Sequence, residues 1–314
     1  MSELAVTEQS HELIPADGYR SPDWYEARRE CVSASEIAVI LGLAKPAWGS
    51  PFDLWWEKRT GHDSQPESDD MRKGRRFEGD VIEDFLAANP HFTVATVGLV
   101  ANNARPWQVC TPDGLVFEGA EEPVAVLEAK TSNERSAWGE PGTDEIPIDY
   151  RCQVMWQMDC LGLNVAYVPV WFGLADYAEY VVEYREADAL LMREAAEEFL
   201  ASLREDKQPD IDASFATRRR LRYLHPELTD ETAEIPATLV RQYQRAKATR
   251  DAAQARMDLA ENRIRSLIGP ASKAEFIDGD GKRRTLSHSI YEVAEHVRKA
   301  STTDRINFPR KAVS

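Results

Sequence analysis

Apolar and polar residues alternate with a helical period along much of the first ninety residues. A Ser-x-x-Glu capping box at residues 33–36 precedes an apolar run at 37–41, so a short helix is expected there. A Ser-Pro pair at residues 50–51 begins a second helix that continues to Arg59, with proline in its first turn. A longer helix is predicted at residues 71–88, because apolar side chains form one stripe along it.

After this helix the apolar pattern changes to a period typical of strands. Strands are expected at residues 92–100, 115–117, 124–131, 165–172 and 179–184, and further helices at 149–161 and 187–205. This order, with helices around a short meander of strands, predicts an α/β fold rather than a repeat or a helical bundle.

The last hundred residues have a pattern of their own. Apolar or small residues recur at alternating intervals of three and four across residues 235–268, with one polar interruption, which predicts a long helix. Such a helix suits either a coiled coil or packing within the chain. A hairpin is expected at residues 273–287, because two strand-like segments flank a turn at 278–281.

The composition fits a protein that buries a core in a reducing compartment. The 314 residues include 8 Trp, 10 Tyr and 10 Phe, enough for extensive packing. No apolar run approaches the roughly 20 residues that span a bilayer, and the first residues do not resemble a signal peptide. The 4 cysteines form no Cys-x-x-Cys pair, so no thiolate metal centre is expected. A cytoplasmic location is predicted.

The two parts of the chain differ in the sign of their net charge. The net charge is −16, yet residues 1–210 carry 18 Lys and Arg against 40 Asp and Glu, and residues 211–314 carry 20 against 14. The change of sign predicts a boundary near residue 211, between an acidic domain at 21–210 and a basic extension at 211–314. Residues 1–20 are polar and contain Pro15 and Gly18, so a flexible arm is expected there. An acidic protein can still bind nucleic acid through local cations or a metal. Two basic clusters of the extension, at 218–222 and 282–284, suit either DNA contacts or solvent-exposed faces.

The most informative segment is residues 111–131. Paired as an antiparallel hairpin, its strands bring Asp113 opposite Glu128. Lys130 shares a face with Glu128, because side chains two apart on a strand point the same way. Two carboxylates and a lysine therefore converge on an otherwise apolar face, and a slip of one residue in register would separate them.

This convergence suits metal chemistry. Two bare carboxylates repel each other, and a hard divalent cation such as Mg²⁺ or Mn²⁺ removes that repulsion. A neighbouring lysine can orient or help to deprotonate an attacking water, as in metal-assisted phosphodiester hydrolysis. The alternative is an exposed hairpin on which Glu128 and Lys130 only contact water. The apolar residues that precede Glu128 and the Pro-Asp-Gly turn favour the metal site.

The residues of this segment also resemble a known motif. Thr111-Pro112-Asp113-Gly114-Leu115 followed by Leu127-Glu128-Ala129-Lys130-Thr131 resembles the active-site motif of the PD-(D/E)XK nucleases. Within that superfamily the chain resembles the YqaJ-like viral recombinases, the family of bacteriophage lambda exonuclease, over about residues 20–210. Three further blocks match in order: Trp24-Tyr25-Glu26-Ala27-Arg28 with Ser33-Ala34-Ser35; Gly74-Arg75-Arg76-Phe77-Glu78; and Gln153-Val154-Met155-Trp156-Gln157-Met158.

The resemblance implies a PD-(D/E)XK core, with a mixed central sheet flanked by helices, to which the C-terminal helix and hairpin are added. It implies that Asp113, Glu128 and the backbone carbonyl of Ala129 hold Mg²⁺, with Mn²⁺ as an alternative. Glu78 would assist, directly or through water, and Lys130 would position the nucleophilic water.

Three more residues receive roles from the resemblance. Gln153 would orient water or a phosphate in the active site, and the alternative is an ordinary polar edge of a packed helix. Arg28 and Ser35 would bind the 5′-terminal phosphate of a DNA end. The capping box supports this role, because free backbone N–H groups at a helix N-terminus attract anions. By itself, a capping box is structural in most proteins.

The implied function is a metal-dependent DNA exonuclease that degrades linear duplex DNA from a 5′ end during phage-type homologous recombination. The family further implies a single-strand annealing protein as partner, a ring-shaped homo-oligomer around DNA and, for a phage-encoded chain, the host cytoplasm. Two alternatives remain open. One is a PD-(D/E)XK endonuclease, and the other is a non-catalytic recombination accessory protein that binds DNA ends.

Overall fold

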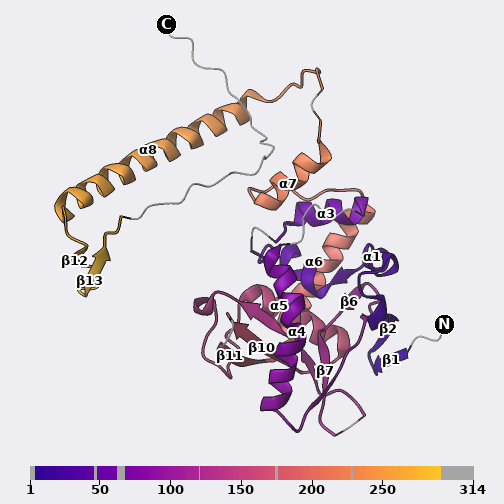
Figure 1. Ribbon diagram of the computed structural model, residues 1–314. Helices are drawn as coiled ribbons and strands as arrows, with labels where there is room; N and C mark the ends of the chain where they lie inside the picture. The colour runs from indigo at the N-terminus through magenta and orange to yellow at the C-terminus, as the bar shows by residue number, and fades with distance from the viewer. Residues whose placement is uncertain are drawn as a thin grey trace. The chain divides into compact units, whose positions relative to one another are not determined.

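The computed structural model of the chain separates into two compact units, residues 1–226 and 227–314 (Figure 1). The residues that the structure describes are 4–45, 48–61, 68–119, 121–173, 176–227 and 229–290. The segment between the helices predicted at residues 50–59 and 71–88 therefore lies largely outside the described residues. Within the described part of the chain, no helix is long and apolar enough to cross a membrane.

A mixed six-stranded sheet carries the hairpin predicted around Asp113 and Glu128. Its strands lie in the order β11-β10-β8-β7-β4, and β9 pairs with β10 beyond the end of β8. Strand β10 runs parallel to β8 and β9 and antiparallel to β11. The strands are β4 (Thr93–Ala95), β7 (Gly114–Phe117), β8 (Ala125–Leu127), β9 (Lys130–Ser132), β10 (Val165–Phe172) and β11 (Asp176–Glu183).

The segment expected to be a flexible arm instead contributes two strands to a second sheet. This sheet has the order β1-β2-β5-β6-β3. Ser10, in β2, is fully buried, and the Thr7 hydroxyl donates to the carbonyl of Leu161 at 2.8 Å. The pairing partner β5 lies some ninety residues further on, so the local sequence carried no sign of it. The strands are β1 (Leu4–Thr7), β2 (Ser10–Ile14), β3 (Val32–Ser33), β5 (Leu99–Asn102) and β6 (Gln108–Cys110).

The strand predicted at residues 92–100 is in fact two strands, β4 and β5, which belong to different sheets. The chain crosses between the sheets at Gly98, where it runs against the backbone of the N-terminal segment. A Cβ on Gly98 would lie 1.9 Å from the carbonyl oxygen of Ile14. Only glycine allows this approach, and an apolar period alone does not reveal it.

Helices cover the sheets, and most of their ends lie within two residues of the predicted ends. Helix α5 is the centre of the core: it packs against strands of both sheets and against α2 and α6, and Trp156 at its middle is fully buried. The mixed α/β fold class is therefore confirmed. The helices of the first unit are α1 (Pro22–Arg28), α2 (Ala34–Ile40), α3 (Pro51–Thr60), α4 (Asp69–Ala88), α5 (Ile148–Leu161), α6 (Glu186–Arg204) and α7 (Phe215–Leu224).

Helix α7 moves the boundary of the first unit from residue 210 to 226. Asp53 on α3, which is 4% exposed, accepts hydrogen bonds from Arg219 at 2.8 Å and from the fully buried Arg220 at 2.7 Å. The cluster at residues 218–222 is thus partly a structural ion pair rather than a free basic face. Charge counting alone assigned it to the extension.

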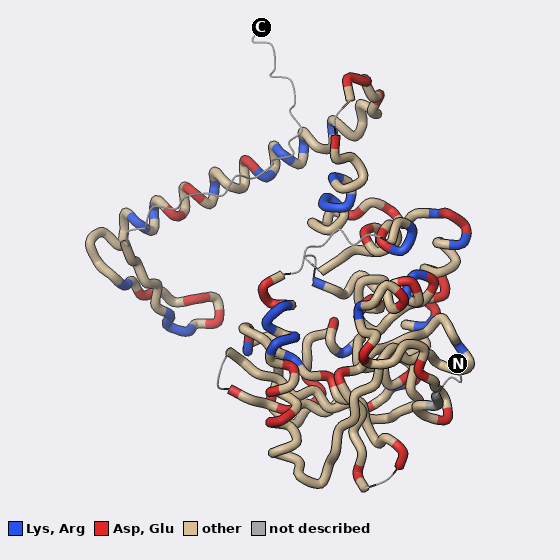
Figure 2. Tube along the Cα trace, turned by 45° about the vertical axis from the view of Figure 1, so that its right-hand side comes forward, with Lys and Arg blue, Asp and Glu red and all other residues tan. Residues whose placement is uncertain are grey.

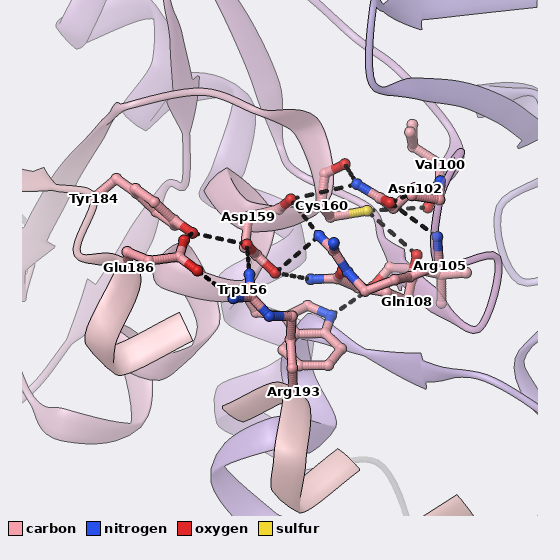
Figure 3. A network of polar contacts seen from close by, with 12 residues as sticks. Val100, Asn102, Arg105, Gln108, Trp156, Asp159, Cys160, Tyr184, Glu186 and Arg193 are labelled. Carbon is pink, nitrogen blue, oxygen red and sulfur yellow. Dashed lines mark hydrogen bonds and ion pairs between the residues drawn. The ribbon is translucent and has the colours of Figure 1, made fainter. Parts of the chain in front are cut away.

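A buried polar network fastens the C-terminal end of α5 to the second sheet and to α6 (Figure 3). Asp159, 5% exposed, accepts hydrogen bonds from Gln108 at 2.7 Å and from Arg193 at 2.6 Å. Tyr184 donates to the same carboxylate at 2.8 Å, and Arg105 lies 3.3 Å from it. Each oxygen therefore has two donors, as a buried carboxylate requires.

The second unit contains the predicted long helix and hairpin. Helix α8 (Ala237–Ile268) has no buried residue along its length, all of which the structure describes. Strands β12 (Lys273–Ile277) and β13 (Arg283–Ser287) pair antiparallel. Both signs of charge alternate along α8 (Figure 2), with ion pairs such as Lys247 to Asp251 at 2.6 Å. In the hairpin, Arg283 pairs with Glu275 at 2.9 Å.

Candidate active site

The hairpin of β7 and β8 has the register expected from the sequence. Gly114 pairs with Leu127 and Val116 with Ala125, so Asp113 and Glu128 follow at the same end of the two strands. Asp113 turns its carboxylate across the gap and accepts a hydrogen bond from the backbone N–H of Ala129 at 2.8 Å. The two carboxylates therefore meet where the sequence predicted.

The strand predicted at residues 124–131 is interrupted after Leu127, and the apolar pattern does not predict this break. β8 ends at Leu127 and β9 begins at Lys130, yet both pair with β10 in one continuous register. The N–H of Glu128 still donates to the carbonyl of Tyr167 at 3.0 Å. In a parallel ladder the next bond would run from residue 169 to the carbonyl of Glu128. Residue 169 is proline, which has no N–H to donate.

Glu128 is the most heavily contacted acid of the cluster. It is 3% exposed and forms an ion pair with Lys130. Gln153, from α5, donates to its Oε1 at 2.6 Å, and Gln157, one turn further along, donates to its Oε2 at 2.7 Å. Gln153 therefore lies in the cluster as predicted. Gln157 shares its helix face, but only the structure reveals that it contacts Glu128.

Lys130 is held between an acid, an amide and an aromatic ring. Its Nζ is 3.3 Å from the amide oxygen of Gln153 and 4.9 Å from the centre of the Tyr150 ring. Burial opposes the charged form most strongly, yet Glu128 and Asp113 together raise the pKa of Lys130 above its ordinary value. The side chain thus remains a cation that can donate hydrogen bonds.

Glu78 approaches the same cluster from α4, which packs against β9 and β10. It is half-buried, and burial together with the charge of Glu128 raises its pKa. Burial and Glu128 raise the pKa of Asp113 well above its ordinary value in the same way. Three acids and one lysine therefore share a poorly solvated site whose negative charge is incompletely balanced.

This donor set fits a hard divalent cation. Mg²⁺ is commonly held by one or two carboxylates and keeps several waters, and Asp113 and Glu128 supply such a pair. Among the described residues, no three His, Cys, Asp or Glu side chains form a ready metal-binding group. The carboxylate oxygens of Glu128 are instead engaged by Lys130, Gln153 and Gln157. A cation bound there would exchange some of these contacts for its own.

The predicted phosphate-binding residues also come together, at the N-terminus of α2. The capping box of Ser33 and Glu36 is present, with the N–H of Ser33 donating to Glu36 at 2.8 Å. Arg28 donates to Glu36 at 2.8 Å and lies 3.4 Å from the hydroxyl of Ser35, which is exposed. The guanidinium also lies 4.3 Å from the centre of the Trp24 ring. The arrangement leaves Ser35 as the solvent-facing member of a cationic helix N-terminus.

Lys58, which was not predicted from the sequence, also contributes a positive charge to this site. Its side chain, 4% exposed, donates to Glu36 at 3.0 Å and to the carbonyl of Arg28 at 2.8 Å. Two cations therefore surround one carboxylate, which gives this site a positive balance. Lys58 follows Leu54 and Trp55 at intervals of four and three on the buried face of α3, and that spacing was the available signal.

The family comparison supplies the remaining observation. Residues 23–164 match the family described as the YqaJ-like viral recombinase domain. This segment of the chain therefore resembles the YqaJ-like viral recombinases. All eight residues predicted for catalysis, metal binding or phosphate binding lie inside the matched segment, and the match supports a recombination nuclease.

The chain also resembles solved structures, at low sequence identity. LHK-Exo, an alkaline exonuclease from Laribacter hongkongensis, is 20% identical with a TM-score of 0.48, over 65% of this chain and 100% of its own. A phage-related exonuclease from Haemophilus somnus 129PT is 12% identical with a TM-score of 0.43, over 56% and 96%. No curated protein matches the chain.

Proposed function

We propose that this protein is a divalent-metal-dependent exonuclease that degrades linear duplex DNA in the 5′ to 3′ direction. The observation that carries the proposal is the meeting of Asp113, Glu128 and Lys130 at the break between β8 and β9. Acids and a lysine in this arrangement suit phosphodiester hydrolysis. The likeness of the whole segment to recombination nucleases supports the same reaction class.

Asp113, Glu128 and the carbonyl of Ala129 would hold the cation. Glu78, which is near enough to interact electrostatically with Glu128, would assist. A bound Mg²⁺ would stabilise the charge that develops on the phosphate and make a bound water more acidic. Lys130 donates a hydrogen bond to the attacking water or to a phosphate oxygen. Gln153 holds Lys130 and Glu128 in a fixed relation, because it contacts both.

The polarity of digestion is assigned to the N-terminus of α2. Arg28 and Ser35 would bind the terminal 5′-phosphate through charge-assisted hydrogen bonds. In this proposal, a strand whose end is held there would extend toward the carboxylates, because Ser35 and Gln153, which contacts Glu128, line the same cavity. The remaining expectations are also proposals: transfer of the product strand to a single-strand annealing protein, a ring of several copies around DNA, and action in the host cytoplasm.

The test is digestion of linear duplex DNA labelled at either the 5′ or the 3′ end, with Mg²⁺, with Mn²⁺ and with EDTA. Wild type is compared with Glu128→Gln and with Glu134→Gln, a control at an exposed acid six residues away. We expect metal-dependent release of the 5′ label by wild type and the control, and loss of more than about a hundredfold in Glu128→Gln.

Closed circular DNA separates the alternatives. Cleavage of circles would indicate an endonuclease. DNA binding with no turnover in any divalent ion would indicate an accessory protein that binds ends. Release of the 3′ label first would overturn the assigned polarity while leaving the nuclease intact.

A further inference from the structure

A small cavity lies between α2 and α5, in the space between the two halves of the candidate site. Its volume is about 110 Å³. Ser35, from the phosphate-binding end, lines one part of it, and Gln153, from the carboxylate cluster, lines another. Its walls are otherwise mostly apolar, apart from one acid.

That acid is Asp149, in the first turn of α5. Asp149 is 5% exposed and lines the cavity, and its Oδ2 has no hydrogen-bond donor among the described residues. Leaving a buried carboxylate oxygen unpaired is costly. The Asp149 carboxylate therefore lies at the wall of the cavity with one oxygen unpaired, where it can accept a hydrogen bond from a molecule bound there.

The aromatic walls of the cavity suit a flat ligand. Trp48 and Tyr150 both line it, with ring centres 5.6 Å apart and planes inclined by 45°. Trp48 is 42% exposed, which is unusual for so large an apolar side chain next to a core. Nucleobases stack on such rings with little regard to sequence. An aromatic cavity with one carboxylate at its wall is therefore matched to a base that carries an N–H donor.

The position of the cavity also indicates a nucleobase as its ligand. Each nucleoside of a DNA strand lies between two phosphates. If Arg28 and Ser35 hold the terminal phosphate, and Glu128 and Lys130 act on the next one, the nucleoside between them must lie beside the cavity.

We propose that this cavity receives the base of the 5′-terminal nucleotide, and that Asp149 accepts a hydrogen bond from an amino group of that base. The inference rests on the proposed function and adds a base preference to it. Adenine, cytosine and guanine carry an exocyclic amino group. Thymine carries none, and its single ring N–H lies between two carbonyl oxygens that a carboxylate repels. Terminal thymidylate is therefore the disfavoured substrate.

Two measurements on the full chain test this. The first is single-turnover release of the first nucleotide from duplexes that differ only in the 5′-terminal base, with Mg²⁺. The second is calorimetric binding of dAMP, dCMP, dGMP and dTMP in EDTA, which needs no turnover. Each is made with wild type, with Asp149→Asn, and with Glu198→Gln as a control at an exposed acid of α6.

We expect wild type and the control to release terminal thymidylate about fivefold or more slowly than the other three nucleotides, and to bind dTMP correspondingly more weakly. Asp149→Asn should reduce both differences to within about twofold, because an amide can offer either an acceptor or a donor. Equal release and equal binding of all four nucleotides by wild type would overturn the inference, whatever the stability of the variant. Absence of release from every end would refute the proposed nuclease, and the calorimetric order would then decide the base preference.

Discussion

The buried network around Asp159 allows a stability prediction that is independent of function. Replacing Asp159 with alanine removes the acceptor for four donors, of which Gln108 lies on β6, Arg193 on α6, and Arg105 and Tyr184 in connecting segments (Figure 3). The arginines left behind are 15% and 27% exposed, so water can partly solvate them. Gln108 is fully buried, and its amide would lose its only described acceptor.

The cost follows from these exposures. An unpaired buried amide costs about 1–3 kcal/mol, and a lost charge-assisted hydrogen bond to Arg193 adds a similar amount. The sum agrees with the about 3–5 kcal/mol expected when one partner of a buried ion pair is removed. We therefore expect Asp159→Ala to lower the free energy of unfolding of the first unit by about 3 kcal/mol or more.

Tryptophan fluorescence measures this directly. All 8 tryptophans of the chain lie in residues 24–171, within the first unit, so urea unfolding of the full chain followed by their emission reports that unit. With an m-value of about 3 kcal/mol per M, the midpoint should fall by about 1 M urea. The melting temperature should fall by roughly 10 °C.

Glu26→Ala is the matched control. Glu26 pairs with Arg29 at 3.2 Å, but the acid is 71% exposed, so its loss should change stability by less than about 1 kcal/mol. If Asp159→Ala unfolds at the same urea concentration as Glu26→Ala, the carboxylate contributes no net stability, and the assignment of this network as the fastening of α5 is wrong.

Three further predictions concern the site. Lys130→Ala should reduce digestion of linear duplex DNA by more than about a hundredfold at temperatures where the variant remains folded, because the cation acts on the reacting groups. Ser35→Ala should lower the preference for 5′-phosphorylated over 5′-hydroxyl ends by about fivefold in competition digests, since one hydrogen bond to the phosphate is lost. Burial favours the neutral form of Glu36, yet Lys58, Arg28 and the N–H of Ser33 together hold its pKa below the ordinary value of 4.5. The stability it contributes is therefore present above about pH 4.5 and is lost as the pH falls through the lower folded pKa, so acid unfolding curves of wild type should be steeper there than those of Glu36→Gln.

Each of these predictions has an outcome that contradicts it. Wild-type rates in Lys130→Ala would remove the lysine from the mechanism. An unchanged phosphate preference in Ser35→Ala would move the end-binding site away from the N-terminus of α2. Parallel acid-unfolding curves for wild type and Glu36→Gln would show that the cations near Glu36 give no folded-state preference for its charged form.

Local features of this fold could be predicted from the sequence. The capping box at Ser33 and the register that brings Asp113 toward Glu128 each depend on residues close together in the chain. A hairpin register follows from the turn and the strand pattern, so one sequence segment contains all the information it needs. Residues 111–131 alone therefore suffice to predict the carboxylate–lysine cluster.

Features that depend on distant partners could not be predicted in this way. The N-terminal strand β2 pairs with β5, and Asp53 pairs with arginines more than 160 residues away. The polar residues involved, such as Arg220 and Lys58, look like surface residues in the sequence because their partners are not local. Their burial is explained only by the ion pairs that the fold completes.

The interrupted strand has a practical consequence for anyone who would build this site elsewhere. If an acid and a lysine lie two residues apart on a continuous strand, the backbone carbonyl of the acid accepts a hydrogen bond from the adjacent strand. Here Pro169, on the adjacent strand, withholds one N–H, and the flanking pairs keep the two strand pieces aligned. The carbonyl of Glu128 can then turn away from the neighbouring strand without breaking a sheet hydrogen bond worth about 1 kcal/mol. A designer who transplants the acidic pair and the lysine would therefore need to transplant a proline from the neighbouring strand as well.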